Sequence, residues 1–143
     1  MIRLATDDDA PFIAEFYYDI RQDSVLSIHD VGSIEWYITN RLIKRGSSCV
    51  YVENDEIVGW VDVHEDWVDQ LYCRRGHTGK GIGVQLLNFA KSKSPSGLQL
   101  WTFQVNSGAR RFYAREGFVE VELTDGQTNE ERLPDVRMEW TQR

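Results

Sequence analysis

Residues 73–83 of this 143-residue chain read Cys-Arg-Arg-Gly-His-Thr-Gly-Lys-Gly-Ile-Gly. The segment follows Trp67–Arg74, which predicts a strand, and precedes residues 84–90, whose apolar side chains recur at helical spacing. Glycines at 79, 81 and 83 allow a sharp turn and leave backbone N–H groups uncovered at the start of that helix. Together with the helix dipole, these donors attract an anion, and a pyrophosphate suits them well.

Other glycine loops can be compared with this one. A Walker loop needs Ser or Thr after its Gly-Lys pair, and here Gly81 follows Lys80. A dinucleotide-binding loop lies in an N-terminal strand–helix–strand unit, with an acidic residue about 20 positions further on. No acid follows this loop until Glu116. A purely structural turn stays open as the alternative to an anion site.

The charges are unevenly distributed along the chain. The whole sequence has 16 basic and 23 acidic residues, a net charge of −7. Between Gln70 and Arg115 there are eight basic residues and no Asp or Glu, so this segment carries +8 and the remainder −15. A net acidic chain is a poor general binder of nucleic acid or of anionic membranes, so neither is expected as a partner. The local basic segment instead favours a small polyanion.

Length and patterning predict one domain over residues 1–143. The apolar fraction of 41% is enough for a single core. Alternating segments predict strands at 2–5, 48–53, 57–64, 67–74, 98–105, 118–123 and 136–140, with an Asn54-Asp55 hairpin turn. Helices are expected after Thr6, over 33–44, from about 84, and between Asn106 and Gly117. This order predicts a mixed α/β fold in which helices connect strands.

Three features bear on compartment and metals. Charged residues follow Met1 at once, and no apolar run approaches the roughly 18 residues of a membrane span, so no signal peptide or span is expected. Cys49 and Cys73 belong to no CxxC or Cys/His cluster, which predicts two buried thiols in a cytoplasmic protein. The histidines, His29, His64 and His77, fit no zinc spacing, so no metal is expected. Cys73 lacks a nearby partner that would make it a nucleophile.

Two motifs carry a family resemblance. A strand followed by Gly79-Lys-Gly-Ile-Gly-Val-Gln-Leu-Leu87 resembles the acyl-CoA-binding motif of the GNAT N-acetyltransferases. Residues 106–118 resemble the family's second signature through Asn106, Ala109, Tyr113, Gly117 and Phe118. The resemblance implies a mostly antiparallel sheet that is splayed at its middle strands and flanked by about four helices. Thr78 stands where the family usually has Gln or Arg, and Arg75 where proline is common, which leaves open which side chains touch the phosphates.

The resemblance also implies a site for acetyl-CoA as co-substrate. The pyrophosphate is expected on the amides of Thr78, Gly79, Lys80, Gly81, Ile82 and Gly83. The pantetheine arm is expected between Leu71-Tyr72-Cys73 and residues 100–104, where N–H groups near Leu71–Cys73 polarise the thioester carbonyl. Asn106 caps its helix or also bonds the arm. Arg111, beside Arg110, reaches the 3′-phosphate or lies on a solvated helix face.

Two catalytic residues are expected. Tyr113 stands where the family places the tyrosine that protonates the departing thiolate, although an amphipathic helix also buries aromatics in this position. A phenol, with a pKa near ~10, suits a thiolate leaving group. Asp69 is the last acid before the basic segment and is the expected general base. Glu65, Asp66 and His64 are the alternatives.

The expected reaction is direct attack of a primary amine, from a small molecule or a peptide or protein, on acetyl-CoA in a ternary complex. The competing hypothesis is a CoA-binding sensor or interaction module without turnover. Acids and aromatics outside the basic segment suit a cationic amine, or else only keep the surface soluble. They are Asp19, Asp23, Asp30, Glu35, Glu130, Glu131, Asp135, Tyr17, Tyr18, Trp36, Tyr37 and Trp67. The sequence leaves the acyl preference and the oligomeric state open, a homodimer included.

Overall fold

The computed structural model describes residues 1–24 and 30–142, with the side chains of 22–24 left out. Its strands are β1 (Ile2–Leu4), β2 (Ser48–Glu53), β3 (Glu56–His64), β4 (Trp67–Cys73), β5 (Leu98–Phe103), β6 (Val119–Leu123) and β7 (Asp135–Trp140). Its helices are α1 (Ala10–Ser24), α2 (Val31–Tyr37), α3 (Ile82–Lys93) and α4 (Ser107–Arg115), with the short turns η1 (Asp7–Asp9) and η2 (Ile38–Ile43).

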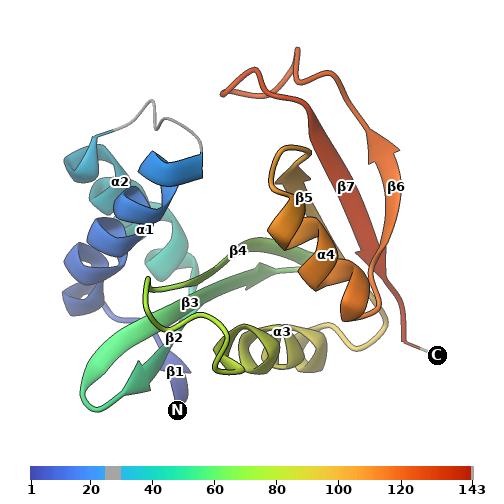
Figure 1. Ribbon diagram of the computed structural model, residues 1–143. Coiled ribbons are helices and arrows are strands. Elements are labelled where there is room, and N and C mark those ends of the chain that lie inside the picture. The colour runs from blue at the N-terminus through green and yellow to red at the C-terminus, as the bar shows by residue number, and fades with distance from the viewer. Residues whose placement is uncertain (25–29, 143) are drawn as a thin grey trace.

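The strands form one sheet in the order β1-β2-β3-β4-β5-β7-β6. Every described neighbour pair is antiparallel except β4 and β5, which are parallel and pair only at Trp67 and Gln99. Beyond that pair the two middle strands separate, and β5, β7 and β6 turn away from β1–β4 (Figure 1). The expected mixed fold with a mostly antiparallel, centrally splayed sheet and four helices is confirmed.

Each face of the sheet has its own apolar core. On one face α3 and α4 bury Leu86, Leu87 and Tyr113 against β3, β5 and β7. On the other, α1, α2 and η2 bury Ile13 and Trp60 with their neighbours against β2 and β3. The two cores leave the separated ends of β4 and β5 between them, with α1 on one side and α4 on the other (Figure 1).

Local sequence signals account for most element boundaries. Asn54 and Asp55 both have positive φ, 53° and 62°, as a tight hairpin turn requires, so the predicted turn is confirmed. The helix expected over 33–44 begins earlier, at Val31, because Asp30 caps it by accepting from the Ser33 N–H at 2.7 Å. It then widens into the π-helical η2.

The first helix also differs from expectation. Residues 7–9 form a separate 3-10 turn, and α1 begins at Ala10. Asp9 is buried there and accepts hydrogen bonds from both terminal nitrogens of Arg3, at 2.7 and 3.0 Å. Asp9 therefore does more than complement a helix dipole, because its ion pair ties the start of α1 to β1.

Candidate functional site

The loop between β4 and α3 has a backbone that only glycine adopts easily. Gly76, Gly79 and Gly81 have φ of 82°, 78° and 83°. A Cβ at Gly79 or Gly81 would touch nothing within 4 Å, so conformation rather than crowding requires these glycines. Within the described chain, the N–H groups of residues 78–81 donate to no protein acceptor, and helical bonding begins at Gln85, whose N–H donates to Gly81. The loop thus presents a row of free donors at the N-terminus of α3.

The basic side chains of this loop divide into two groups. Arg74 lies over the Phe16 ring and pairs with Glu56 at 3.5 Å, and Arg75 pairs with Asp19 at 2.7 Å. These two arginines therefore fasten the loop to the rest of the domain. Lys80 is exposed and has no partner among the described residues, and the buried Nδ1 of His77 has none there either. Lys80 and His77 remain available to an anion on the free amides.

The end of β4 forms an open strand edge. Leu71, Tyr72 and Cys73 pair with β3, opposite Val61, Trp60 and Gly59. On the other side the pairing to β5 stops at Trp67, so the groups of residues 71–73 that point toward β5 have no strand partner. Such an edge can pair with an extended amide-containing chain, as a further strand would.

Tyr113 lies on α4 at this opening. Only 8% of it is exposed, and its ring packs against Phe112 and Phe118. Burial, followed by the charges of Tyr72 and Cys73, raises the pKa of Tyr113. The phenol therefore stays protonated at neutral pH and lies near the end of β4, so it can donate a proton there.

Two further predicted residues of α4 have distinct environments. Asn106 caps the helix, since its side-chain oxygen accepts from the Ala109 N–H at 3.1 Å, which leaves its amide NH₂ free. Arg110 is held by Glu120 at 2.7 Å and donates to the Gln104 carbonyl at 3.0 Å. Arg111 has no hydrogen bond or ion pair within the described residues, so of the pair it is the one available to a ligand.

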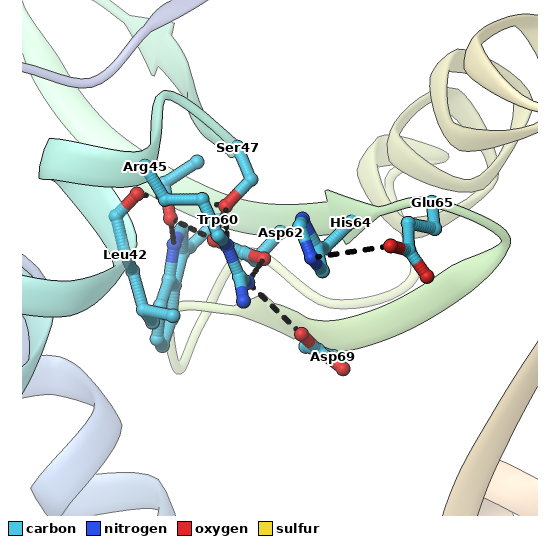
Figure 2. A network of polar contacts seen from close by, with 9 residues as sticks. Leu42, Arg45, Ser47, Trp60, Asp62, His64, Glu65 and Asp69 are labelled. Carbon is cyan, nitrogen blue, oxygen red and sulfur yellow. Dashed lines mark hydrogen bonds and ion pairs between the residues drawn. The ribbon is translucent and has the colours of Figure 1, made fainter.

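Asp69 belongs to a polar network on the α2 face of the sheet (Figure 2). Its carboxylate accepts from Arg45 at 2.9 Å, and the same Arg45 nitrogen lies 2.7 Å from Asp62. Burial raises the pKa of Asp69, the Arg45 hydrogen bond opposes this, and the Asp62 charge adds to it. The Asp69 side chain is 38% exposed, so solvent and a ligand can reach it.

Asp62 is the buried centre of this network. It is fully buried and accepts from the hydroxyls of Ser47 at 2.9 Å and Ser48 at 2.5 Å, as well as from Arg45. Ser48 in turn accepts from the indole N–H of Trp60 at 3.1 Å. Each side chain of this set has at least one hydrogen-bond partner, so the network fixes Arg45 and, through it, Asp69.

Sequence reasoning did not find Arg45, Ser47, Ser48 or Asp62. Their one sequence signal is Asp62 itself, a charged residue within the otherwise apolar run 57–63 of a central strand. The alternative bases differ in position. His64 and Glu65 are 3.9 Å apart at the β3–β4 turn, and Asp66 accepts from Gln99 at 3.0 Å.

Most of the acidic residues expected around the acceptor amine make contacts within the protein. Asp19 pairs with Arg75, Glu131 with Arg21 at 3.3 Å, and Asp30 caps α2. Asp135 accepts from Thr124 and Asn129. The side chain of Asp23 and all of His29 lie outside the described residues. The acids therefore do not form an open ring of free carboxylates.

Three remaining observations concern thiols, metals and membranes. Cys49 and Cys73 are half-buried free thiols, and burial raises the pKa of each. Across 1–24 and 30–142, no three His, Cys, Asp or Glu residues gather as a metal site would require. No helix in the described chain combines the length and apolarity that a membrane crossing needs.

Comparisons with known proteins agree with this geometry. The family model for the acetyltransferase (GNAT) domain matches residues 44–120. A protein of Mycobacterium tuberculosis described as a probable N-acetyltransferase is 29% identical over 136 residues, covering 82% of this chain and 78% of that protein. An uncharacterized N-acetyltransferase of Methanocaldococcus jannaschii is 34% identical over 82 residues, 54% of this chain, and the match spans 34% of its length.

Solved structures show the same fold. An N-acetyltransferase from Staphylococcus aureus Mu50 superposes with a TM-score of 0.82 at 14% identity, covering 97% of this chain and 99% of that one. YncA from Salmonella typhimurium, whose structure holds its cofactor acetyl-CoA, superposes with a TM-score of 0.76 at 19% identity, covering 100% of this chain and 94% of that one.

Proposed function

The chain belongs to the GNAT acetyltransferase family, and from that premise we propose that it transfers the acetyl group of acetyl-CoA to a primary amine. The observation that carries the proposal is the row of unpaired N–H groups at residues 78–81, next to the open edge of β4. A pyrophosphate fits the first feature and a pantetheine arm, with its two amides, fits the second. Both lie within one continuous stretch, from Leu71 to Gly83.

The basic segment supports the assignment of CoA. Lys80 and Arg111 have no hydrogen-bond or ion-pair partner in the described part of the chain, and His77 presents a buried Nδ1 without one there. In the proposed complex the loop amides bind the pyrophosphate, Lys80 and His77 add donors beside it, and Arg111 receives the 3′-phosphate. The free NH₂ of Asn106 bonds the arm as it passes α4.

Two proton transfers accompany the reaction. The amine nitrogen forms a bond to the acetyl carbon, and the carbon–sulfur bond breaks, so one proton leaves the amine and one reaches the sulfur. We assign the second transfer to Tyr113, because its raised pKa keeps the phenol protonated and the charges of Tyr72 and Cys73, at the end of β4, contribute to that rise. N–H groups of residues 71–73 stabilise the negative charge that develops on the carbonyl oxygen.

We assign the first transfer to Asp69. Its raised pKa makes it a stronger base than an ordinary exposed Asp, and Arg45 orients its carboxylate. Asp69 lies on the same strand as Leu71–Cys73, two to four residues away, which corresponds to roughly 7–13 Å along the strand. A chain of about two to four water molecules, with links of about 2.8 Å, can bridge that distance to the amine.

The proposal is tested by turnover. The purified protein is mixed with acetyl-CoA and a panel of primary amines, including amino acids, polyamines and peptide N-termini, and free CoA is measured with a thiol-reactive dye. Acetyl-CoA binding is measured separately by calorimetry, and the panel without protein is the control. Binding together with amine-dependent CoA release is expected. Binding without release from any amine would instead favour a CoA-binding sensor, and absence of binding would contradict both functions.

A further inference from the structure

Arg21 spans the opening between the separated strands. It lies on α1, and its guanidinium carbon is 5.5 Å from the centre of the Tyr17 ring and 5.6 Å from that of Phe103 at the end of β5. One terminal nitrogen donates to the Tyr17 hydroxyl at 2.7 Å, and the other lies 3.3 Å from Glu131, in the loop between β6 and β7. The guanidinium therefore contacts α1, the end of β5 and the loop between β6 and β7.

Arg21 has N–H donors that its contacts within the protein do not use. A guanidinium carries five N–H groups, and the hydrogen bonds to Tyr17 and Glu131 use two of them. Its Nε is buried and has no hydrogen-bond partner among the described residues, although the side chain as a whole is 15% exposed. A buried N–H without an acceptor is unfavourable, so an acceptor arriving with a ligand would be bound favourably.

The surrounding charges favour an anionic group over a second cation. The carboxylates expected to receive a cationic amine are largely used: Asp19 by Arg75, Asp69 by Arg45, and Glu131 by Arg21 itself. The contact between Arg21 and Glu131 is single and long, at 3.3 Å. A carboxylate would instead meet a planar fork that can bind it through two parallel hydrogen bonds.

We propose that Arg21 binds a carboxylate of the acceptor, so that the acceptor is an amino-carboxylate, with amine and carboxylate a few bonds apart, rather than a simple cationic amine. The inference rests on the proposed function. The amine would lie at the acetyl group near Leu71–Cys73, and the carboxylate would displace Glu131 from the guanidinium. The hydrogen bond to the Tyr17 hydroxyl and the contact with the Phe103 ring help to fix the guanidinium.

The test uses acceptors that differ only in the carboxylate: each L-amino acid and its carboxamide, with acetyl-CoA and detection of released CoA. For the best pair, the wild-type kcat/KM is expected to be at least ~10-fold higher for the acid, which corresponds to one charge-assisted hydrogen-bonded pair. Arg21→Gln should bring the acid-to-amide ratio close to one and leave the rate with the amide within ~3-fold. Arg21→Lys, which keeps the charge and loses the fork, should lie between them.

Two further variants sharpen the test. Glu131→Gln removes the competing carboxylate, so it should raise the acid-to-amide ratio several-fold. Arg41→Gln is the matched control, because Arg41 lies over Trp36 at 5.4 Å, away from this opening, and its loss should leave the ratio unchanged. A wild-type ratio near one, or a ratio that Arg21→Gln leaves intact, would overturn the inference while the acetyltransferase activity still stands.

Binding distinguishes the two proposals if no acceptor turns over. Absence of turnover contradicts the proposed function, and N-acetyl amino acids and their amides are then titrated in the presence of CoA, with tryptophan fluorescence as the readout. At least ~10-fold tighter binding of the acid, lost in Arg21→Gln, would support a carboxylate site at Arg21. Equal binding of acid and amide, or binding of neither, would overturn it.

Discussion

Two regions lie beside the separated strands β4 and β5, and they present different chemical groups: one presents backbone N–H groups and the other presents side chains. The loop of residues 74–81 is a backbone site, in which the N–H groups of residues 78–81 have no partner in the described chain and the shape depends on glycines. The network of Arg45, Asp62 and Asp69 is a side-chain site in which each of these side chains is hydrogen-bonded. The loop has free N–H donors that can bind a ligand, whereas the network is rigid. We infer that the loop holds the cofactor and that the network holds the base.

The contrast predicts that the two regions fail in different ways when they are mutated. A change at residues 78–81 should alter ligand affinity with little loss of fold stability, since their N–H groups bond nothing in the described chain. A change at the centre of the network should destabilise the fold, because it leaves buried groups without partners. Changes at the proposed catalytic residues, Tyr113 and the partly exposed Asp69, should alter the rate with little effect on stability.

The largest effect is expected from Asp62→Ala. It removes the acceptor of Ser47, Ser48 and Arg45 in a fully buried position, so the free energy of unfolding should fall by about 3–5 kcal/mol. Urea denaturation followed by circular dichroism measures this loss. Asp69→Asn is the matched control, because it touches the same Arg45 but is partly exposed, and it should cost less than about 1 kcal/mol. Equal losses in the two variants would show that the network has no buried centre.

Tyr113→Phe should reduce kcat about 100-fold, as expected for loss of a general acid. The ring still fills its place between Phe112 and Phe118, so the calorimetric affinity for acetyl-CoA and the unfolding free energy should change little. An unchanged kcat would assign Tyr113 to the core alone.

Asp69→Asn should reduce kcat/KM about 10- to 100-fold and change its pH dependence. In the wild type, the rate falls as the pH drops through the raised pKa of Asp69, because protonation removes the base. In the variant this fall in rate at acidic pH should be absent. Since the raised pKa means that the Asp69 charge is disfavoured in the folded state, the neutral Asn should not destabilise the fold at neutral pH. If the rate of the variant still falls at acidic pH, the base would instead be His64 or Asp66.

Gly81→Ala should give the smallest effect of the four. A residue with Cβ is disfavoured at a φ of 83°, so the loop should shift and the KM for acetyl-CoA should rise about 10-fold. Gly32→Ala in α2, where φ is not positive, is the control and should leave KM unchanged. An equal rise in KM in both variants would show that acetyl-CoA binding does not depend on the conformation of Gly81.

The same contrast explains how much could be predicted from the sequence. The glycine loop, the Asn106 cap, the Asn54-Asp55 turn and the position of Tyr113 on a helix all follow from local spacing, so they could be predicted. The Asp62 network could not, because its members come together only through the pairing of β2 with β3 and the end of η2. Arg21 and Glu131 are separated by 110 positions, and no local pattern connects them. Backbone sites leave a signature in the sequence, whereas side-chain networks depend on the tertiary fold.

The binding of CoA by the loop backbone is tested most directly by NMR. In a titration of ¹⁵N-labelled protein with CoA, the amide resonances of residues 78–83 should shift downfield as their free N–H groups acquire phosphate acceptors. The indole N–H of Trp60, already bonded to the Ser48 hydroxyl in the network, should keep its resonance in place. CoA binding that leaves the resonances of residues 78–83 unchanged would contradict the account, because the phosphates would then be held elsewhere.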